Sequence, residues 1–231
     1  YAGTISAAGG LVFTGDGNAL GTPANVSLGG NVVLTNDTAV TVNRSGSGPN
    51  ARNKTLRKVD LTNPGSILSV TNLSGYGLEF TGAITLNGAS HFAVSNATAS
   101  NLVPGLVLSG VVADAGGYDL TKSGAGTLLL SNPANTFGGA TATIDILAGV
   151  LAASSDAALG NAGNKVRLNV DGTTDIGFRA TASFSSARTF ILNQANNAFE
   201  VTSGNALTLS APFTLSATTN TLTKNDNGTL V

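Results

Sequence analysis

The chain of 231 residues contains no cysteine, no methionine and no tryptophan, and only 5% of its residues are aromatic. Without cysteine, a disulfide framework, thiol catalysis and metal sites with cysteine ligands are excluded. Charged residues make up 10% of the chain and the formal net charge is −1. No field is therefore present that would attract nucleic acid or an anionic membrane. No run of about 18 apolar residues occurs either, so we expect no transmembrane helix and no membrane insertion.

The ends of the sequence also lack features. The chain begins at Tyr1 without a signal peptide, and it contains no methionine, so we expect it to be a fragment of a longer chain. Neither end resembles the cap that a β-helix needs over its terminal strands. Two explanations remain open: the parent chain continues beyond both ends, or identical copies stack head to tail in a filament.

What the chain does contain is short runs of alternating apolar and polar residues. Gly, Asn, Ser and Thr interrupt every window before helical periodicity can extend over three turns. The alternating runs are typical of strands of about four to six residues. They lie at 32–43, 66–73, 78–88, 105–112, 126–132, 165–172, 188–193, 198–210 and 213–224. The sequence therefore predicts an all-β chain.

Two phrases of the sequence recur at unequal distances. The phrase "DLTKSGAGTLLLSN" at 119–132 returns as "TLTKNDNGTLV" at 221–231, a shift of 102 positions. The segment 15–37 resembles 154–172, where Ala-Leu-Gly recurs after 139 positions. Insertions between such landmarks are tolerated by a solenoid more readily than by a closed sandwich. We therefore predict a parallel β-helix with about 20 to 29 residues per coil.

Residues 120–160 resemble the passenger-associated repeat of bacterial autotransporters and related large surface proteins. The shared motifs are Leu-Thr-Lys-x-Gly-x-Gly-Thr-Leu, Asn-Thr-Phe-x-Gly, Ala-Gly-x-Leu and Ala-Leu-Gly. They lie at 120–128, 135–139, 148–151 and 158–160. Asp145 and Ile146 depart from the family, which usually has a shorter and more polar strand there. The resemblance implies a right-handed parallel β-helix exported to the cell exterior, and no particular activity.

An enzymatic site finds little support in the sequence. His91 is the only histidine, and beside Phe92 in an alternating run it is best explained as a surface or turn residue. The carboxylates lie mostly singly in turns, although stacking of coils can bring distant ones together. Two turns, "GDGN" at 15–18 and "NDNG" at 225–228, have the composition of calcium loops without their repetition. Corner turns explain both better, and we expect no catalytic residue, metal or cofactor.

The densest charge lies at 52–58, "RNKTLRK", after the Gly-, Ser- and Pro-rich segment 44–51. We expect residues 44–58 to form a loop excursion from one continuous β-helix that spans residues 1–231. Two hypotheses fit the loop: contact with an anionic partner such as a glycan or a neighbouring subunit, or a solvated segment that keeps a strand edge soluble. The second is favoured. The residues of a partner contact would be Arg52, Lys54, Arg57 and Lys58.

Taken together, these features predict a non-enzymatic structural segment of a bacterial extracellular or cell-surface protein. It would serve as a stalk, an adhesin shaft or a fibre, with stacked backbone hydrogen bonds and an aliphatic core. Its expected partners are the rest of a longer chain or other copies of itself, and host or matrix glycans. The alternatives are a carbohydrate-binding or carbohydrate-cleaving β-helix and a surface-array protein.

Overall fold

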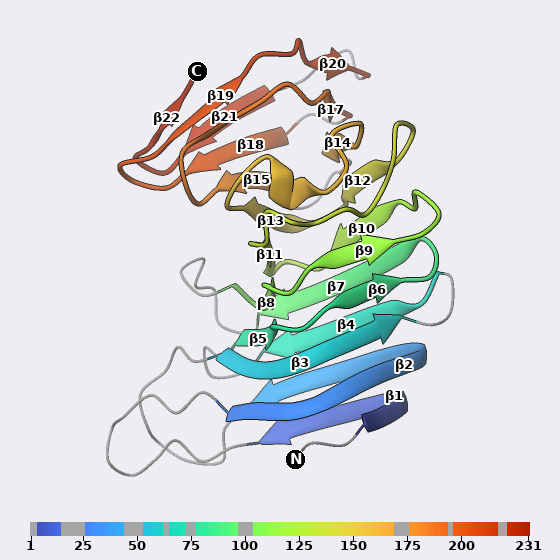
Figure 1. Ribbon diagram of the computed structural model, residues 1–231. Coiled ribbons are helices and arrows are strands. Elements are labelled where there is room, and N and C mark those ends of the chain that lie inside the picture. Colours follow the sequence, from blue (N-terminus) through green and yellow to red (C-terminus); the bar gives the residue numbers. More distant parts are fainter. Residues whose placement is uncertain are drawn as a thin grey trace.

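The protein is an all-β column of stacked coils (Figure 1). The computed structural model describes residues 4–14, 26–43, 53–61, 65–72, 77–96, 104–168, 176–193, 196–216 and 221–231. Every strand pairing in these ranges is parallel, with β1 at one end of the column and β22 at the other. The predicted fold class, an all-β parallel β-helix, is confirmed.

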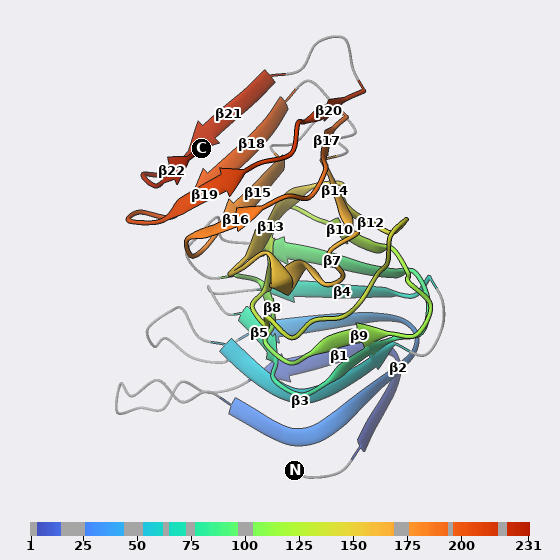
Figure 2. The same cartoon turned by 45° about the horizontal axis from the view of Figure 1, so that its top comes forward.

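Each coil passes through three faces, which we number in chain order. The first three strands, β1 (Thr4–Thr14), β2 (Val26–Asn43) and β3 (Asn53–Leu61), are long and continue from one face to the next, as their curvature in Figure 2 shows. Later strands are shorter, and each lies on one face. Turn residues at the corners separate them.

Face 1 contains the first parts of β2 and β3 and then β5 (Gly77–Phe80), β8 (Leu106–Leu108), β11 (Thr127–Leu130), β13 (Gly149–Ala153), β15 (Ile176–Ala180), β18 (Asn196–Val201) and β21 (Thr221–Asn225). Face 3 contains the last parts of β1 and β2 and then β4 (Ile67–Asn72), β7 (Ser90–Asn96), β10 (Leu120–Ser123), β12 (Thr143–Ile146), β14 (Lys165–Leu168), β17 (Phe190–Leu192) and β20 (Thr214–Leu215). Both ladders are continuous.

Face 2 is interrupted in the middle. Its first section contains parts of β1, β2 and β3, with β6 (Ile84–Leu86) and β9 (Val112–Asp114). Its last section is a separate sheet of β16 (Phe184–Ser186), β19 (Ala206–Leu209) and β22 (Thr229–Leu230). Between them, residues 131–142 and 154–164 form loops, the second of which includes the 3-10 helix η1 (Ala157–Leu159). We call this stretch the face 2 gap.

The length of a coil varies along the column. Leu106 pairs with Leu128 22 positions later, whereas Leu151 pairs with Phe178 27 positions later. Both spacings fall within the predicted 20 to 29 residues. Because the spacing is not constant, a phrase that recurs after a fixed number of residues need not return to the same face.

The core is a set of apolar rows that run along the column axis. On face 3, Leu120, Ile144, Val166 and Phe190 lie in register and are almost completely buried. Toward the C-terminal end the rows become aromatic. The rings of Phe178, Phe190 and Phe199 meet edge to face at centroid distances of 5.2 to 6.1 Å. Such pairs contribute about 0.5–1.5 kcal/mol beyond their buried area.

The predicted loop excursion at 44–58 requires a correction. Residues 53–58 belong to β3, where Lys54 pairs with Val26 of β2 and with Leu78 of β5. Alternation in "NKTLRKVDL" was obscured by its basic residues, although a strand on an outer surface can carry charges at every second position. Residues 44–52 lie outside the described ranges.

Candidate functional site

The basic residues predicted to contact a partner are divided between a strand and the undescribed part of the chain. Lys54, Arg57 and Lys58 are in β3, and Arg52 lies outside the described residues. Lys54 and Lys58 pair with different parts of β2, because β3 continues from face 1 to face 2. The structure therefore places these three residues along a ladder rather than at the tip of a loop.

Lys122, in the recurring phrase, has its side chain inside the coil and is 0% exposed. Its backbone pairs with Phe92 on one side and Ile146 on the other. The ammonium donates to the carbonyls of Ser123 at 2.7 Å, Gly124 at 2.7 Å and Ala148 at 2.9 Å. Burial lowers the pKa of Lys122 to about 7. The lysine thus joins the corner of one coil to the next coil.

The second copy of the phrase makes the same corner at a different place in the coil. Lys224 donates to the carbonyls of Asn225 at 2.5 Å and Asp226 at 2.8 Å. Lys122 is at the turn from face 3 to face 1, whereas Lys224 lies on face 1 and precedes the turn to face 2. The phrase therefore encodes a strand, a corner and a strand, and not a fixed position within the repeat.

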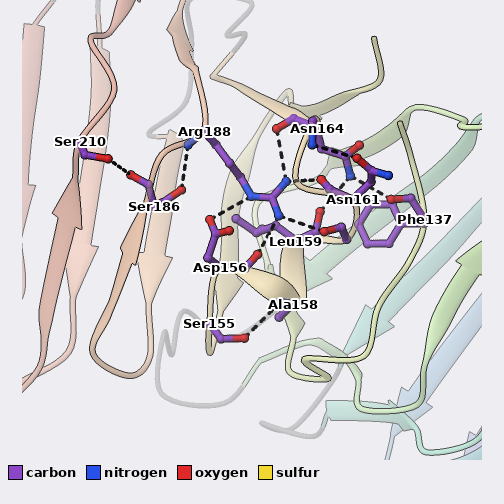
Figure 3. A network of polar contacts seen from close by, with 12 residues as sticks. Phe137, Ser155, Asp156, Ala158, Leu159, Asn161, Asn164, Ser186, Arg188 and Ser210 are labelled. Atoms are coloured by element: carbon purple, nitrogen blue, oxygen red, sulfur yellow. Dashed lines mark hydrogen bonds and ion pairs between the residues drawn. The ribbon is translucent and has the colours of Figure 1, made fainter. Parts of the chain in front are cut away.

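Arg188 is 4% exposed and holds the loop of the face 2 gap together (Figure 3). Its Nε donates to Asp156 Oδ1 at 2.9 Å, and Nη2 donates to the carbonyls of Asp156 at 3.0 Å and Gly160 at 2.9 Å. Nη1 donates to the carbonyls of Asn161 and Asn164. One guanidinium therefore supplies the donors for a loop that has no strand partner.

Two buried asparagines replace strand pairing in the same gap. Asn135 accepts a hydrogen bond from the Val112 N–H at 2.8 Å and donates to the Ala158 carbonyl at 2.7 Å. Asn164 donates to the carbonyls of Phe137 at 3.0 Å and Leu159 at 2.9 Å. Both asparagines thus join successive coils. The motifs that resemble the passenger-associated repeat lie here, and their polar side chains bind backbone.

A groove with a volume of about 450 Å³ lies on the outside of face 1. Arg179, Thr181, Thr202, Ser203, Asp226 and Asn227 are among the residues that line it. Arg179 Nε lies 2.8 Å from Glu200 Oε2, and Nη2 lies 3.1 Å from Asp226 Oδ2. The three charges come from successive coils, on β15, on β18 and at the corner after β21.

Burial sets the electrostatics of this groove. The side chains of Arg179 and Glu200 are 11% and 9% exposed, and that of Asp226 is 33% exposed. Burial raises the pKa of Glu200, and the neighbouring Arg179 opposes that rise. Together the three groups carry a formal charge of −1 when ionised. The guanidinium is compensated within the groove.

The remaining candidates of the sequence are not part of this site. His91 is half-buried in β7, and its Nε2 lies 2.6 Å from Ser123 Oγ, which agrees with a surface position on a strand. The turn at 225–228 is a corner, whereas 15–18 lies outside the described residues. Within the described ranges, no group of three or more His, Cys, Asp and Glu side chains is placed to hold a metal ion.

Sequence reasoning missed the charged pairs and the buried cations. Arg179 and Glu200 are register partners on adjacent coils, and Asp145 and Arg167 are another such pair, 22 positions apart. Opposite charges separated by one coil length would have been the signal. Lys122 and Arg188 give no comparable signal, because their acceptors are backbone carbonyls.

Comparison of the chain with models of protein families, with curated proteins and with solved structures gives no match. The resemblance to the passenger-associated repeat therefore stays a prediction that rests on residues 120–160. Among the helices of the described ranges, none combines the length and apolar character needed to cross a membrane.

Proposed function

We propose that this chain is a structural segment of a bacterial extracellular or cell-surface β-helix protein, in which it forms a stalk, an adhesin shaft or a fibre. The observation that carries the proposal is the continuity of the parallel ladders of faces 1 and 3, from the first strands to β21 and β20. A column of this kind transmits load along its axis through stacked coils rather than through a single compact core.

The buried polar side chains support the same role. Lys122, Arg188, Asn135 and Asn164 direct their donors to backbone carbonyls of other coils or of the loops between coils. Such contacts fix corners and fill the face 2 gap, where strand pairing is missing. A rod requires this kind of local repair, because one weak coil would break the column.

Stretching single molecules of the chain between two handles tests the proposal. A coil of 22 to 27 residues releases about 70 to 95 Å of extended chain, so we expect a series of unfolding steps of this length. Release of the whole chain in one step, at the force that opens an ordinary compact domain, would overturn the load-bearing role.

A surface array and a carbohydrate-binding β-helix are the alternative functions. Lateral sheets of the purified chain in electron micrographs would favour the array, whereas separate rods would favour the stalk. The groove over Arg179 is the observation that favours carbohydrate binding, and it is compatible with a stalk that also adheres.

A further inference from the structure

The groove on the outside of face 1 has the size of a small-ligand site. Its volume of about 450 Å³ falls within the range of about 300–1,000 Å³ that is typical of such pockets. Ala152 at its floor is 1% exposed, and a Cβ added to Gly177 would lie 3.5 Å from Glu200 Oε1. The small residues on this face therefore leave room above the charged side chains.

The hydroxyl groups of the groove are oriented by the backbone. Thr181 Oγ1 donates to the Ala153 carbonyl at 3.1 Å, and Thr202 Oγ1 donates to the Ala180 carbonyl at 3.3 Å. Since each hydroxyl proton is used in this way, the oxygen lone pairs are the groups that remain for a ligand. The two oxygens belong to successive coils, which stack at about 4.8 Å. They form a short row of fixed acceptors.

The charges of the groove select against ionic ligands. Two edges of the Arg179 guanidinium already face the carboxylates of Glu200 and Asp226. An anion would have to displace one of these carboxylates, and a cation would meet the guanidinium between them. A neutral ligand with many hydroxyl groups meets neither penalty. It can donate to Asp226 and the threonine oxygens and can accept from the amide of Asn227.

Asp226 supplies a second and independent observation. It is the one residue other than glycine with a positive φ, 62°, in the described part of the chain. The first copy of the recurring phrase has Gly124 at this corner, with a φ of 75°. An aspartate in this conformation costs about 1 kcal/mol or more compared with glycine. What the chain gains is a carboxylate that lines the groove, and such strain is concentrated at functional sites.

We propose that this groove binds a neutral oligosaccharide, with Asp226 and the oxygens of Thr181 and Thr202 as its main hydrogen-bonding groups. Arg179 positions Asp226, and the Thr methyl groups with Pro104 form apolar walls against sugar ring faces. The site goes beyond the structural role and does not depend on it, because a rod without ligands would also satisfy the proposed function.

The test is a binding survey of the chain with neutral and charged glycans. The neutral panel contains hexamers of α-1,4-glucose, β-1,4-glucose, mannose, xylose and N-acetylglucosamine, and the charged panel contains polygalacturonate, heparin and chondroitin sulfate. We expect at least one neutral oligosaccharide to bind in calorimetric titration. No binding by any neutral member, or binding confined to the charged panel, would overturn the proposal.

Two matched substitutions assign the binding to the groove. Asp226→Asn keeps a residue that tolerates a positive φ but removes the carboxylate, and we expect the affinity to fall at least tenfold. Asp145→Asn makes the same change in the ion pair with Arg167 on face 3, and we expect no change in affinity. Circular dichroism confirms that both variants are folded. Full affinity in Asp226→Asn, or an equal loss in both variants, would place the ligand elsewhere and refute the assignment.

Discussion

At the scale of single residues, the most informative side chain is Lys122. A lysine within an alternating strand is expected on the solvent side, yet here it occupies a core position and is 0% exposed. It is accommodated because the corner beside it turns three carbonyls inward, at 2.7 to 2.9 Å from its amine. The recurring Lys-x-x-x-Gly phrase is therefore a device for building a corner.

Replacement of Lys122 by methionine tests this device. Methionine has a similar volume but no donors, so the three carbonyls lose their partner inside the coil. We expect the free energy of unfolding at pH 8.5 to fall by about 2–4 kcal/mol in denaturant titrations. Lys165→Met, at an exposed position of β14, is the control and should change stability by less than about 0.5 kcal/mol. A Lys122→Met variant as stable as the parent would refute the corner role.

The same lysine predicts a pH dependence. Burial lowers its pKa from 10.5 to about 7, so between these values the unfolded chain binds a proton that the folded chain does not. Stability contributed by this residue therefore rises as the pH increases through this window and is lost as the pH falls through about 7. We expect the stability of the parent relative to Lys122→Met to increase from pH 6 to pH 9. A difference that is independent of pH would show that the carbonyls keep the ammonium charged.

At the scale of elements, the face 2 gap shows how a solenoid tolerates a segment without strands. Residues 154–164 have no strand partner, and the side chains of Arg188, Asn135 and Asn164 bind their carbonyls instead. Each of these contacts joins residues on different strands or coils. The gap is therefore as closely tied to the column as the faces beside it, but through single side chains.

Substitution of Arg188 by methionine should loosen this element selectively. The change removes the ion pair with Asp156 and leaves several loop carbonyls without donors, so we expect a loss of about 3–5 kcal/mol. Hydrogen exchange should accelerate at 154–164 before it accelerates on face 1. Arg167→Met is the matched control: the Arg167 side chain is 36% exposed, and its removal should cost about 1 kcal/mol or less. Equal effects in the two variants would contradict this account.

At the scale of the whole molecule, the column behaves as a one-dimensional stack in which each coil contacts only its neighbours. Leu128 is 0% exposed and lies between Leu106 and Leu151 in the core of face 1. Its neighbour Leu129 points outward and is half-buried. The pair allows the continuity of the core to be tested at one level of the column.

The substitution Leu128→Asp places a carboxylate between two leucines and should disrupt one coil. Because the stack is one-dimensional, we expect the coils on either side to unfold separately, which would give two transitions in calorimetry where the parent gives a broader single one. Leu129→Asp, on the outer side, should leave the number of transitions unchanged. Complete loss of structure in Leu128→Asp would show that the column folds as one globular unit instead.

Much of the fold could be predicted because its signals are local. Alternation in runs such as 78–88 and 126–132 marks strands, and the apolar positions in them are those found inside the column. The loop at 53–58 was predicted wrongly because charges masked the alternation of β3. None of the groove was predicted, since Arg179 and Asp226 are 47 positions apart and meet only after two further coils.

The sequence by itself determined the class of fold, the approximate coil length and the phrases that build corners, because each depends on residues that are close along the chain. Only the tertiary structure decided on which face each corner falls, where Lys122 and Arg188 direct their donors, and that Arg179 lies between Glu200 and Asp226. The physical reason is that coils of 22 to 27 residues accumulate unequal offsets. Which side chains become neighbours across the stack therefore follows from the register of every coil between them.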